Sequence, residues 1–129
     1  MTGYANNIEN EMSANTNFRK VLYTGSHMQL VAMSLKPLED IGMEVHDTVD
    51  QFFRFESGQG KVVMNGEETV VDGSMVVIVP AGTQHNIINT SESEDLKLYT
   101  IYAPANHPDG TVHATKADAM AAEAEKHGV

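Results

Sequence analysis

The segment KVVMNGEETVV, residues 61 to 71, constrains the fold more than any other part of the chain. Two runs rich in Val flank Asn65-Gly66, a dipeptide that suits a two-residue type I′ hairpin because both central residues need φ > 0. A later VPAG, residues 79 to 82, predicts a type I turn with Pro second and Gly fourth. Short strands between such turns, over residues 18 to 102, predict an all-β barrel or sandwich.

Two terminal segments differ from this β region. Residues 1 to 17 are polar and rich in Asn, so we expect a flexible N-terminal arm with little to bury. Near the other end, Thr115 and Asp118 form a T-x-x-D capping box, and Gly128 is a stop signal, so a helix lies between them. Its weak apolar stripe would lie against the barrel and contains Ala117, Met120, Ala121 and Ala124. The expected parts are therefore an arm (1–17), a β-barrel (18–104), and a C-terminal loop and helix packed on the barrel (105–129).

The charge of the chain limits its partners. Its 129 residues include 8 basic and 18 acidic ones, which gives a formal net charge of −10. Such a charge repels phosphate backbones and anionic lipid, so we expect neither nucleic-acid nor membrane binding. There is no Cys, no apolar run of the length that spans a bilayer, and no apolar stretch near the start that resembles a secretory signal. We therefore expect a cytoplasmic protein.

The segment MEVHDTVDQFF, residues 43 to 53, holds candidate metal ligands. Side chains two residues apart on a strand share a face, so Glu44 and His46 could grip one ion. Gln51 and Asp50 compete for the next ligand position. If Gln51 faces inward, the aromatic residues of QFFRFE follow it into the barrel, whereas an inward Asp50 brings Arg and Glu with it. Because burying that charged pair is costly, we expect Gln51 inside and Asp50 at the rim.

A second cluster, VPAGTQHNIIN, spans residues 79 to 89. Here a turn leads into a strand on which His85, Ile87 and Asn89 share one face. His85 would meet the first cluster only if the two strands lie close across the barrel, which spacing alone does not establish. Asn89 either hydrogen-bonds near the site or begins the following turn. The remaining polar candidates are expected to be ordinary loop residues, with two alternatives, that they cap the barrel mouth or bind a second ion: His107, Asp109 and His113.

These two clusters resemble the paired motifs of the cupin superfamily. Its second motif, G(x)5PxG(x)2H(x)3N, is matched from Pro80 through Gly82, His85 and Asn89, with the upstream Gly73 displaced by one residue. In its first motif, G(x)5HxH(x)3-4E(x)6G, His46 falls on the second His and Gly58 on the final Gly. Gln51 stands at the Glu position, Glu44 at the first His position and Leu38 at the first Gly position. The resemblance covers roughly residues 30 to 103.

The resemblance implies a double-stranded β-helix, the jelly-roll barrel of cupins, with a short C-terminal α-helix. It also implies a metal at the centre of the barrel, with Glu44, His46, Gln51 and His85 as ligands. Compared with three His and one Glu, this set keeps the same charge, because Glu44 supplies the carboxylate that Gln51 lacks. Two His and one carboxylate also form the ligand set of non-haem Fe(II) oxygenases. Fe, Mn, Zn, Ni and Co all suit such a set.

Because fold alone does not give function, three readings stay open. The first is a metal-dependent enzyme that acts on a small oxygen-rich molecule, either by isomerase or lyase chemistry through a metal-stabilised enolate or by O₂-dependent oxidation. In this reading Glu44 or Asp50 would move the proton. The second is a module that binds or senses a small ligand without turnover, and the third is a barrel without metal. We favour the enzyme, and the resemblance also implies a homodimer.

Overall fold

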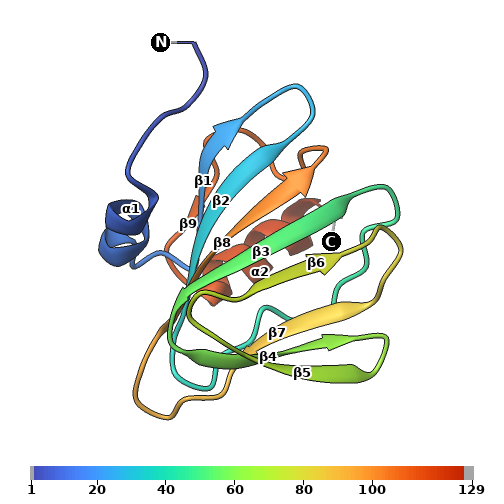
Figure 1. Ribbon diagram of the computed structural model, residues 1–129. Helices are drawn as coiled ribbons and strands as arrows, with labels where there is room; N and C mark the ends of the chain where they lie inside the picture. The colour runs from blue at the N-terminus through green and yellow to red at the C-terminus, as the bar shows by residue number, and fades with distance from the viewer. Residues whose placement is uncertain (1, 127–129) are drawn as a thin grey trace.

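A computed structural model describes residues 2–126 and confirms the all-β fold, as two antiparallel sheets face each other (Figure 1). The larger sheet has the order β6-β3-β8-β2-β1-β9, and the smaller has the order β5-β4-β7. In chain order the elements are α1 (Ile8–Ala14), β1 (Arg19–Thr24), β2 (Gln29–Leu35), β3 (Asp50–Ser57), β4 (Gln59–Met64), β5 (Glu67–Asp72), β6 (Val76–Val79), β7 (His85–Asn89), β8 (Leu96–Ala103), β9 (Val112–His113) and α2 (Lys116–Lys126).

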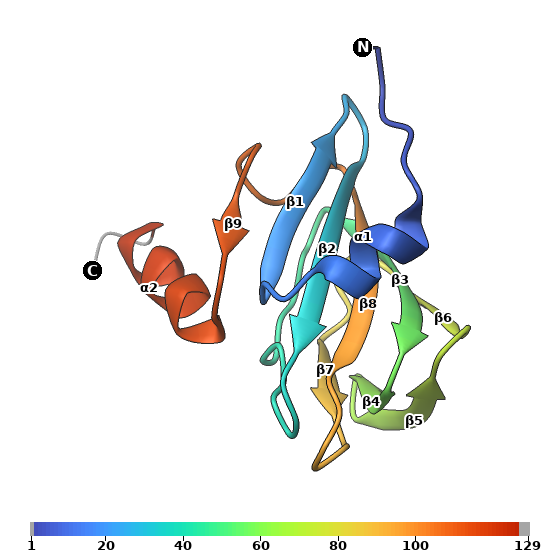
Figure 2. The same ribbon diagram turned by 90° about the vertical axis from the view of Figure 1, so that its left-hand side faces the viewer.

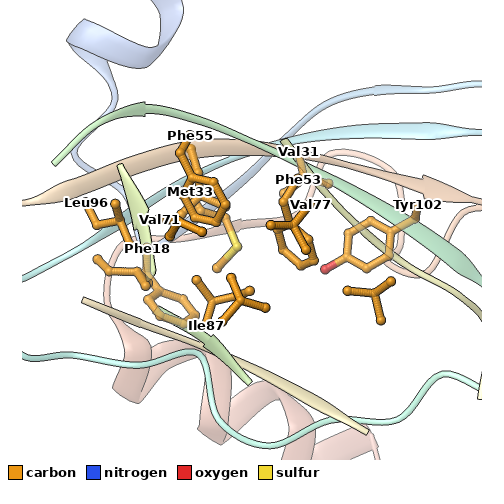
Figure 3. Close-up of a cluster of buried hydrophobic side chains, with 14 of the residues drawn as sticks. Phe18, Val31, Met33, Phe53, Phe55, Val71, Val77, Ile87, Leu96 and Tyr102 are labelled. Carbon is orange, nitrogen blue, oxygen red and sulfur yellow. The ribbon is translucent and has the colours of Figure 1, made fainter. Parts of the chain in front are cut away.

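The core lies between the two sheets and is built by alternating residues (Figure 3). On β3, Gln51, Phe53 and Phe55 are all buried, and Asp50 is exposed. The predicted register of this strand is therefore confirmed. On β8, Tyr102 points inward into the same core and is 2% exposed. The middle of the core is apolar, and the buried polar side chains of β7, His85 and Asn89, lie at the two ends of that strand.

The turns explain how the short strands connect. Asn65 and Gly66 have φ of 48° and 83° and join β4 to β5, which confirms the predicted hairpin. The prediction for residues 79 to 82 is wrong by one residue. The amide of Thr83 donates to the Pro80 carbonyl, and Gly82 has φ of 82°, so Gly82 is the third residue of the turn. Positive φ at that position is the mark of a type II turn, which Gly favours.

The N-terminal segment differs from the expectation that it has little to bury. Residues 8 to 14 form α1, and the Asn7 side chain caps this helix by accepting from the Asn10 amide. Met12 is 2% exposed, and α1 contacts β2 and β8 on the outside of the larger sheet (Figure 2). This cover explains why Ala32 and Ser34, on the outer face of β2, are also buried.

The C-terminal helix forms where it was predicted, but the predicted apolar stripe is wrong. The Asp118 amide donates to Thr115 Oγ1, which confirms the cap, whereas Gly128 lies outside the described residues. The stripe residues Ala117, Met120, Ala121 and Ala124 are exposed, and Ala119 is the buried residue. Propensity placed the helix correctly, but the face that packs was set by tertiary contacts, including an ion pair from Lys116 to Asp40 at 2.5 Å.

Two positions where the family motifs hold Gly carry other residues in the left-handed region. Leu38 occupies the first of these positions and has φ of 64°. In the second motif the required position, six residues before Pro80, is Ser74, with φ of 79°. Gly73, beside it, packs so closely that an added Cβ would lie 2.9 Å from the Glu56 carbonyl oxygen. The backbone therefore keeps the shape of both turns although the residues differ from the motif.

Candidate metal centre

Side chains from three separate segments meet at one end of the barrel. Gln51 is the second residue of β3 and His85 the first of β7, so both lie where their strands enter this end. Glu44 and His46 come from the irregular connection between β2 and β3. The structure therefore brings the four expected ligand residues to one end of the barrel, including the His85 that spacing alone could not place.

The irregular connection is held along β7 by main-chain hydrogen bonds. Glu44 and His85 exchange two of them, each 2.9 Å long, and the Gly82 amide donates to the His46 carbonyl at 2.9 Å. Closer to β2, the Ile41 amide donates to the Ile87 carbonyl. A segment without regular strand structure thus has a fixed course beside β7, and Glu44 and His46 have fixed backbones.

The distances show a compact group of polar side chains. Glu44 Oε2 lies 2.9 Å from His46 Nε2, and the rings of His46 and His85 have their centroids 5.6 Å apart. The His46 ring also lies edge-on to Tyr102, with centroids 5.9 Å apart. Glu44 and His46 therefore share one space, as their two-residue spacing predicted.

Neighbouring groups orient the two ligand candidates on the regular strands. His85 Nδ1 lies 3.0 Å from the Thr83 carbonyl oxygen, which can only accept, so Nδ1 carries the proton and a neutral ring has its lone pair on Nε2. Gln51 Nε2 donates to Thr100 Oγ1 at 3.0 Å, and its Oε1 is buried without a hydrogen-bond partner. Two acceptor atoms are thus left available, as in metal sites whose ligands are fixed by an outer layer of hydrogen bonds.

The donor set fits a metal ion but is not arranged around one. Within residues 2–126 no group of three or more His, Cys, Asp or Glu side chains is placed to hold an ion. The direct contact of Glu44 with His46 occupies the space between two of the candidates. Two imidazoles, one carboxylate and one amide oxygen match the ligand preferences of divalent transition metals once that contact opens.

Burial and charge act on the ionisable groups of this space. Burial raises the pKa of Glu44, but the contact with His46 and the Arg19 charge outweigh it and hold the pKa below its ordinary value. Glu44 is therefore a carboxylate at neutral pH. Burial also raises the pKa of Tyr102 far above its ordinary value, so this hydroxyl stays protonated and can donate.

The other polar candidates have different surroundings. Asp50 is exposed and accepts from the Ala81 amide at 2.9 Å, which ties β3 to the turn before β7. Asn89 Nδ2 donates to three carbonyls, those of Leu35, Lys36 and Glu94, so it organises loops at the opposite end of β7 from His85. Neither side chain belongs to the group around Glu44.

His107 is part of the site, whereas the residues with which it was grouped lie apart. Its Nε2 lies 3.2 Å from the Tyr102 hydroxyl, and the buried Gln29 side chain holds the loop by accepting from the His107 amide. Asp109 is exposed. His113 lies on β9 beside Arg19, and burial together with the Arg19 charge lowers its pKa.

Arg19 is a site residue that the sequence interpretation missed. It is the first residue of β1, is 7% exposed, and shares its face with the buried Val21. A signal was present in the sequence, because period-2 alternation from Val21 places Arg19 inside the barrel. Arg normally lies at the surface unless it is paired, so the alternation was not followed to this residue.

A cavity of about 500 Å³ opens beside these residues. It is bounded by the connection that carries Glu44 and His46, by the start of β1, by the loop at residues 106–107, and by one side of α2. The helix therefore covers the mouth of the site instead of lying on the outside of the barrel. Its size suits a small molecule.

Comparison with known proteins identifies the family. Residues 31–102 match the Cupin domain, and the chain belongs to this family. Uncharacterized protein YrkC of Bacillus subtilis (strain 168) is 54% identical over 124 residues, which are 91% of this chain and 66% of YrkC. The chain thus spans slightly less than two thirds of that relative.

Solved structures agree with this assignment. The crystal structure of BH2720 from Bacillus halodurans is 47% identical, with a TM-score of 0.89 over 92% of this chain and 93% of BH2720. TT1209 from Thermus thermophilus is 22% identical, with a TM-score of 0.69 over 78% of this chain and 96% of TT1209, and shares the fold. Among residues 2–126, no helix has the length and hydropathy needed to cross a membrane.

Proposed function

We propose that this cupin binds one divalent transition metal through Glu44, His46, Gln51 and His85, and that it is an enzyme acting on a small oxygen-rich molecule. The observation that supports the proposal best is the orientation of Gln51. A buried amide oxygen without a partner is costly, and here the other end of the same amide is held by Thr100. A cation facing Gln51 Oε1 would remove that cost.

The metal would supply Lewis-acid chemistry to a carbonyl or hydroxyl pair of the substrate, which suits isomerase, lyase or O₂-dependent oxidation reactions. The chain itself contributes the other groups. Tyr102 presents a protonated hydroxyl beside His107, and α2 with the 106–107 loop narrows the access of water. Asp50 is not assigned a proton-transfer role, because its carboxylate is exposed and accepts from the Ala81 amide.

Metal content per chain tests the proposal. Untagged protein, purified without chelators, should contain close to one Fe, Mn, Co, Ni or Zn by elemental mass spectrometry. His46→Ala and His85→Ala should each lose it, whereas Asp50→Ala, at the rim, should keep it. A variant set in which Asp50→Ala loses metal and Gln51→Ala keeps it would contradict the ligand assignment.

Thr100→Val gives a finer test of how Gln51 is held. The substitution keeps the volume and removes the acceptor of the Gln51 amide. Loss of such an orienting group lowers metal affinity by about 10- to 100-fold in other sites, and we expect the lower end here because one ligand of four is affected.

If the wild-type protein binds no metal even after reconstitution, the metalloenzyme proposal fails. The remaining reading would be a barrel that binds a small ligand without metal. A homodimer stays a prediction, which sedimentation would check.

A further inference from the structure

We propose that Arg19 binds the carboxylate of a small carboxylic-acid substrate in the cavity beside Glu44 and His46. This inference rests on the proposed function for the choice of site. It names the substrate class, and it does not need the metal to be bound.

Arg19 is a buried cation outside every ion pair of the described residues. It is 7% exposed, and its Nε is buried without a hydrogen-bond partner. The ion pairs of residues 2–126 join His46 to Glu44, Lys61 to Glu68 and Lys116 to Asp40, so none of them includes Arg19. Burying a charge without a direct partner is expensive, and a bound anion would offset that cost.

The contact of Arg19 with Phe18 orients its guanidinium and leaves one edge available. Its Cζ lies 5.3 Å from the centre of the Phe18 ring, a distance at which cation and ring attract each other. The Arg19 charge also acts on Tyr102, whose pKa it lowers against the larger effect of burial. The planar guanidinium is thus fixed in direction, while Nε–H remains available for a carboxylate oxygen.

The charge distribution around the cavity also favours an anion at Arg19. The cavity is lined by two cationic residues, Arg19 and Lys116, and by two acidic residues, Glu44 and Glu123. Lys116 is paired with Asp40. Glu44 attracts Arg19 at longer range, but its carboxylate is in direct contact with His46. In a protein with a net charge of −10, an anion needs a local positive group, and among the described residues Arg19 is the cavity cation outside any ion pair.

Arginine can be observed directly, because the chain contains two arginines, Arg19 and Arg54. A ¹H–¹⁵N spectrum should therefore show two Nε–Hε signals, and Arg54→Lys assigns them. Arg54 lies on β3, where the burial pattern alternates, and its side chain is on the opposite face from Phe53 and Phe55. Its Nε is also buried without a hydrogen-bond partner, but Arg54 is not among the residues that line the cavity. It therefore serves as an internal control for anion binding to an arginine outside the cavity.

The titration uses metal-free protein and three probes: pyruvate, glycolate and succinate. Concentrations reach about 50 mM, because one charge-assisted contact gives an affinity only in the millimolar range. The Arg19 signal should move downfield and saturate with at least one probe, while the Arg54 signal stays in place. The matched amides pyruvamide, glycolamide and succinamide should not move it. Inorganic phosphate is titrated separately, because it distinguishes a phosphate site from a carboxylate site.

Three results would overturn the proposal. The first is an Arg19 signal that no carboxylate moves, the second is one that the amides move equally, and the third is one that only phosphate moves. Arg19→Lys, which keeps the charge and loses the fork, should weaken carboxylate binding at least tenfold as measured by the shifts of the His46 and His107 ring signals. The wild-type titration decides the question even if this variant does not fold. Metal content is measured separately, so a barrel that binds carboxylates without metal would refute the proposed metalloenzyme and leave this inference standing.

Discussion

The substitution Gln51→Glu tests whether the barrel binds a cation, because its effect on stability differs between a barrel with a cation site and one without. The side chain at this position is 4% exposed, and its oxygen has no hydrogen-bond partner. Glu has almost the same shape as Gln, so packing is preserved and only the charge changes. Without a cation, the new carboxylate must either stay ionised in the interior of the barrel or take up a proton at a raised pKa. Both outcomes lower the free energy of unfolding at pH 7.

The size of the effect follows from this burial. An uncompensated buried charge costs about 3–5 kcal/mol. With about 2.1 cal/mol/K of unfolding entropy per residue, a chain of 129 residues changes its free energy by about 0.27 kcal/mol per degree near the melting temperature. A loss of about 3 kcal/mol thus corresponds to roughly 11 °C in Tm. A saturating divalent ion should restore most of this loss, because a carboxylate is a stronger ligand than an amide.

Differential scanning calorimetry in chelator, and then in excess Mn²⁺ or Zn²⁺, measures both parts. Gln84→Glu is the matched control, because this Gln is exposed and the same charge is added in solvent. The control should show a Tm within about 2 °C of wild type under both conditions, as is usual for surface substitutions. A Gln51→Glu protein that matches wild type in chelator and gains no more from metal would refute the idea that Gln51 Oε1 faces a cation site.

Two further predictions concern the segments around the site. Leu38→Gly should raise the free energy of unfolding by about 0.5–1 kcal/mol in urea titrations. Leu38 is 64% exposed, and its φ of 64° is strained for any residue that carries a Cβ but not for Gly. A loss of stability would show that the Leu38 side chain stabilises the fold by more than this backbone strain destabilises it. Asp40→Asn should lower stability by about 0.5–1 kcal/mol at pH 7, a value that allows for the partial exposure of the pair. The hydrogen bond from Lys116 lowers the pKa of Asp40 from 3.8, so its stabilisation is present above pH 3.8 and is lost as the pH falls below that value. Denaturation curves of wild type and Asp40→Asn should therefore converge in acid, and a constant difference down to about pH 2 would contradict the ion-pair explanation.

The sequence was sufficient to predict the strands and the register of β3. Burying charged side chains is costly, so the face of a strand that carries them is expected to lie outside the core. On β3, an inward Asp50 would have brought Arg54 and Glu56 into the core, and the structure buries Gln51, Phe53 and Phe55 instead. The Asn65-Gly66 turn was equally clear, since few dipeptides accept positive φ at both positions.

Other features depended on contacts that no local pattern contains. The face of α2 that is buried was not its most apolar one, because Ala119 is 9% exposed while Met120, which also lines the cavity, is 63% exposed. Arg19 could be placed inside only by trusting alternation over the usual exposure of arginine. Gln51 is fixed by the hydroxyl of Thr100, and His85 is fixed by the main-chain carbonyl of Thr83. Neither partner is a defined position of a sequence motif.

The reciprocal main-chain bonds between Glu44 and His85 have a consequence for the entropy of binding. A loop that is disordered until an ion arrives must lose about 1–2 kcal/mol of backbone conformational freedom per residue at the moment of binding. Here folding has already fixed the backbones of Glu44, His46 and His85, so only side-chain rotations remain to be ordered. Shortening Glu44 would then remove a proposed ligand without releasing the segment that carries it, since the bonds that hold Glu44 and His46 there join main-chain atoms.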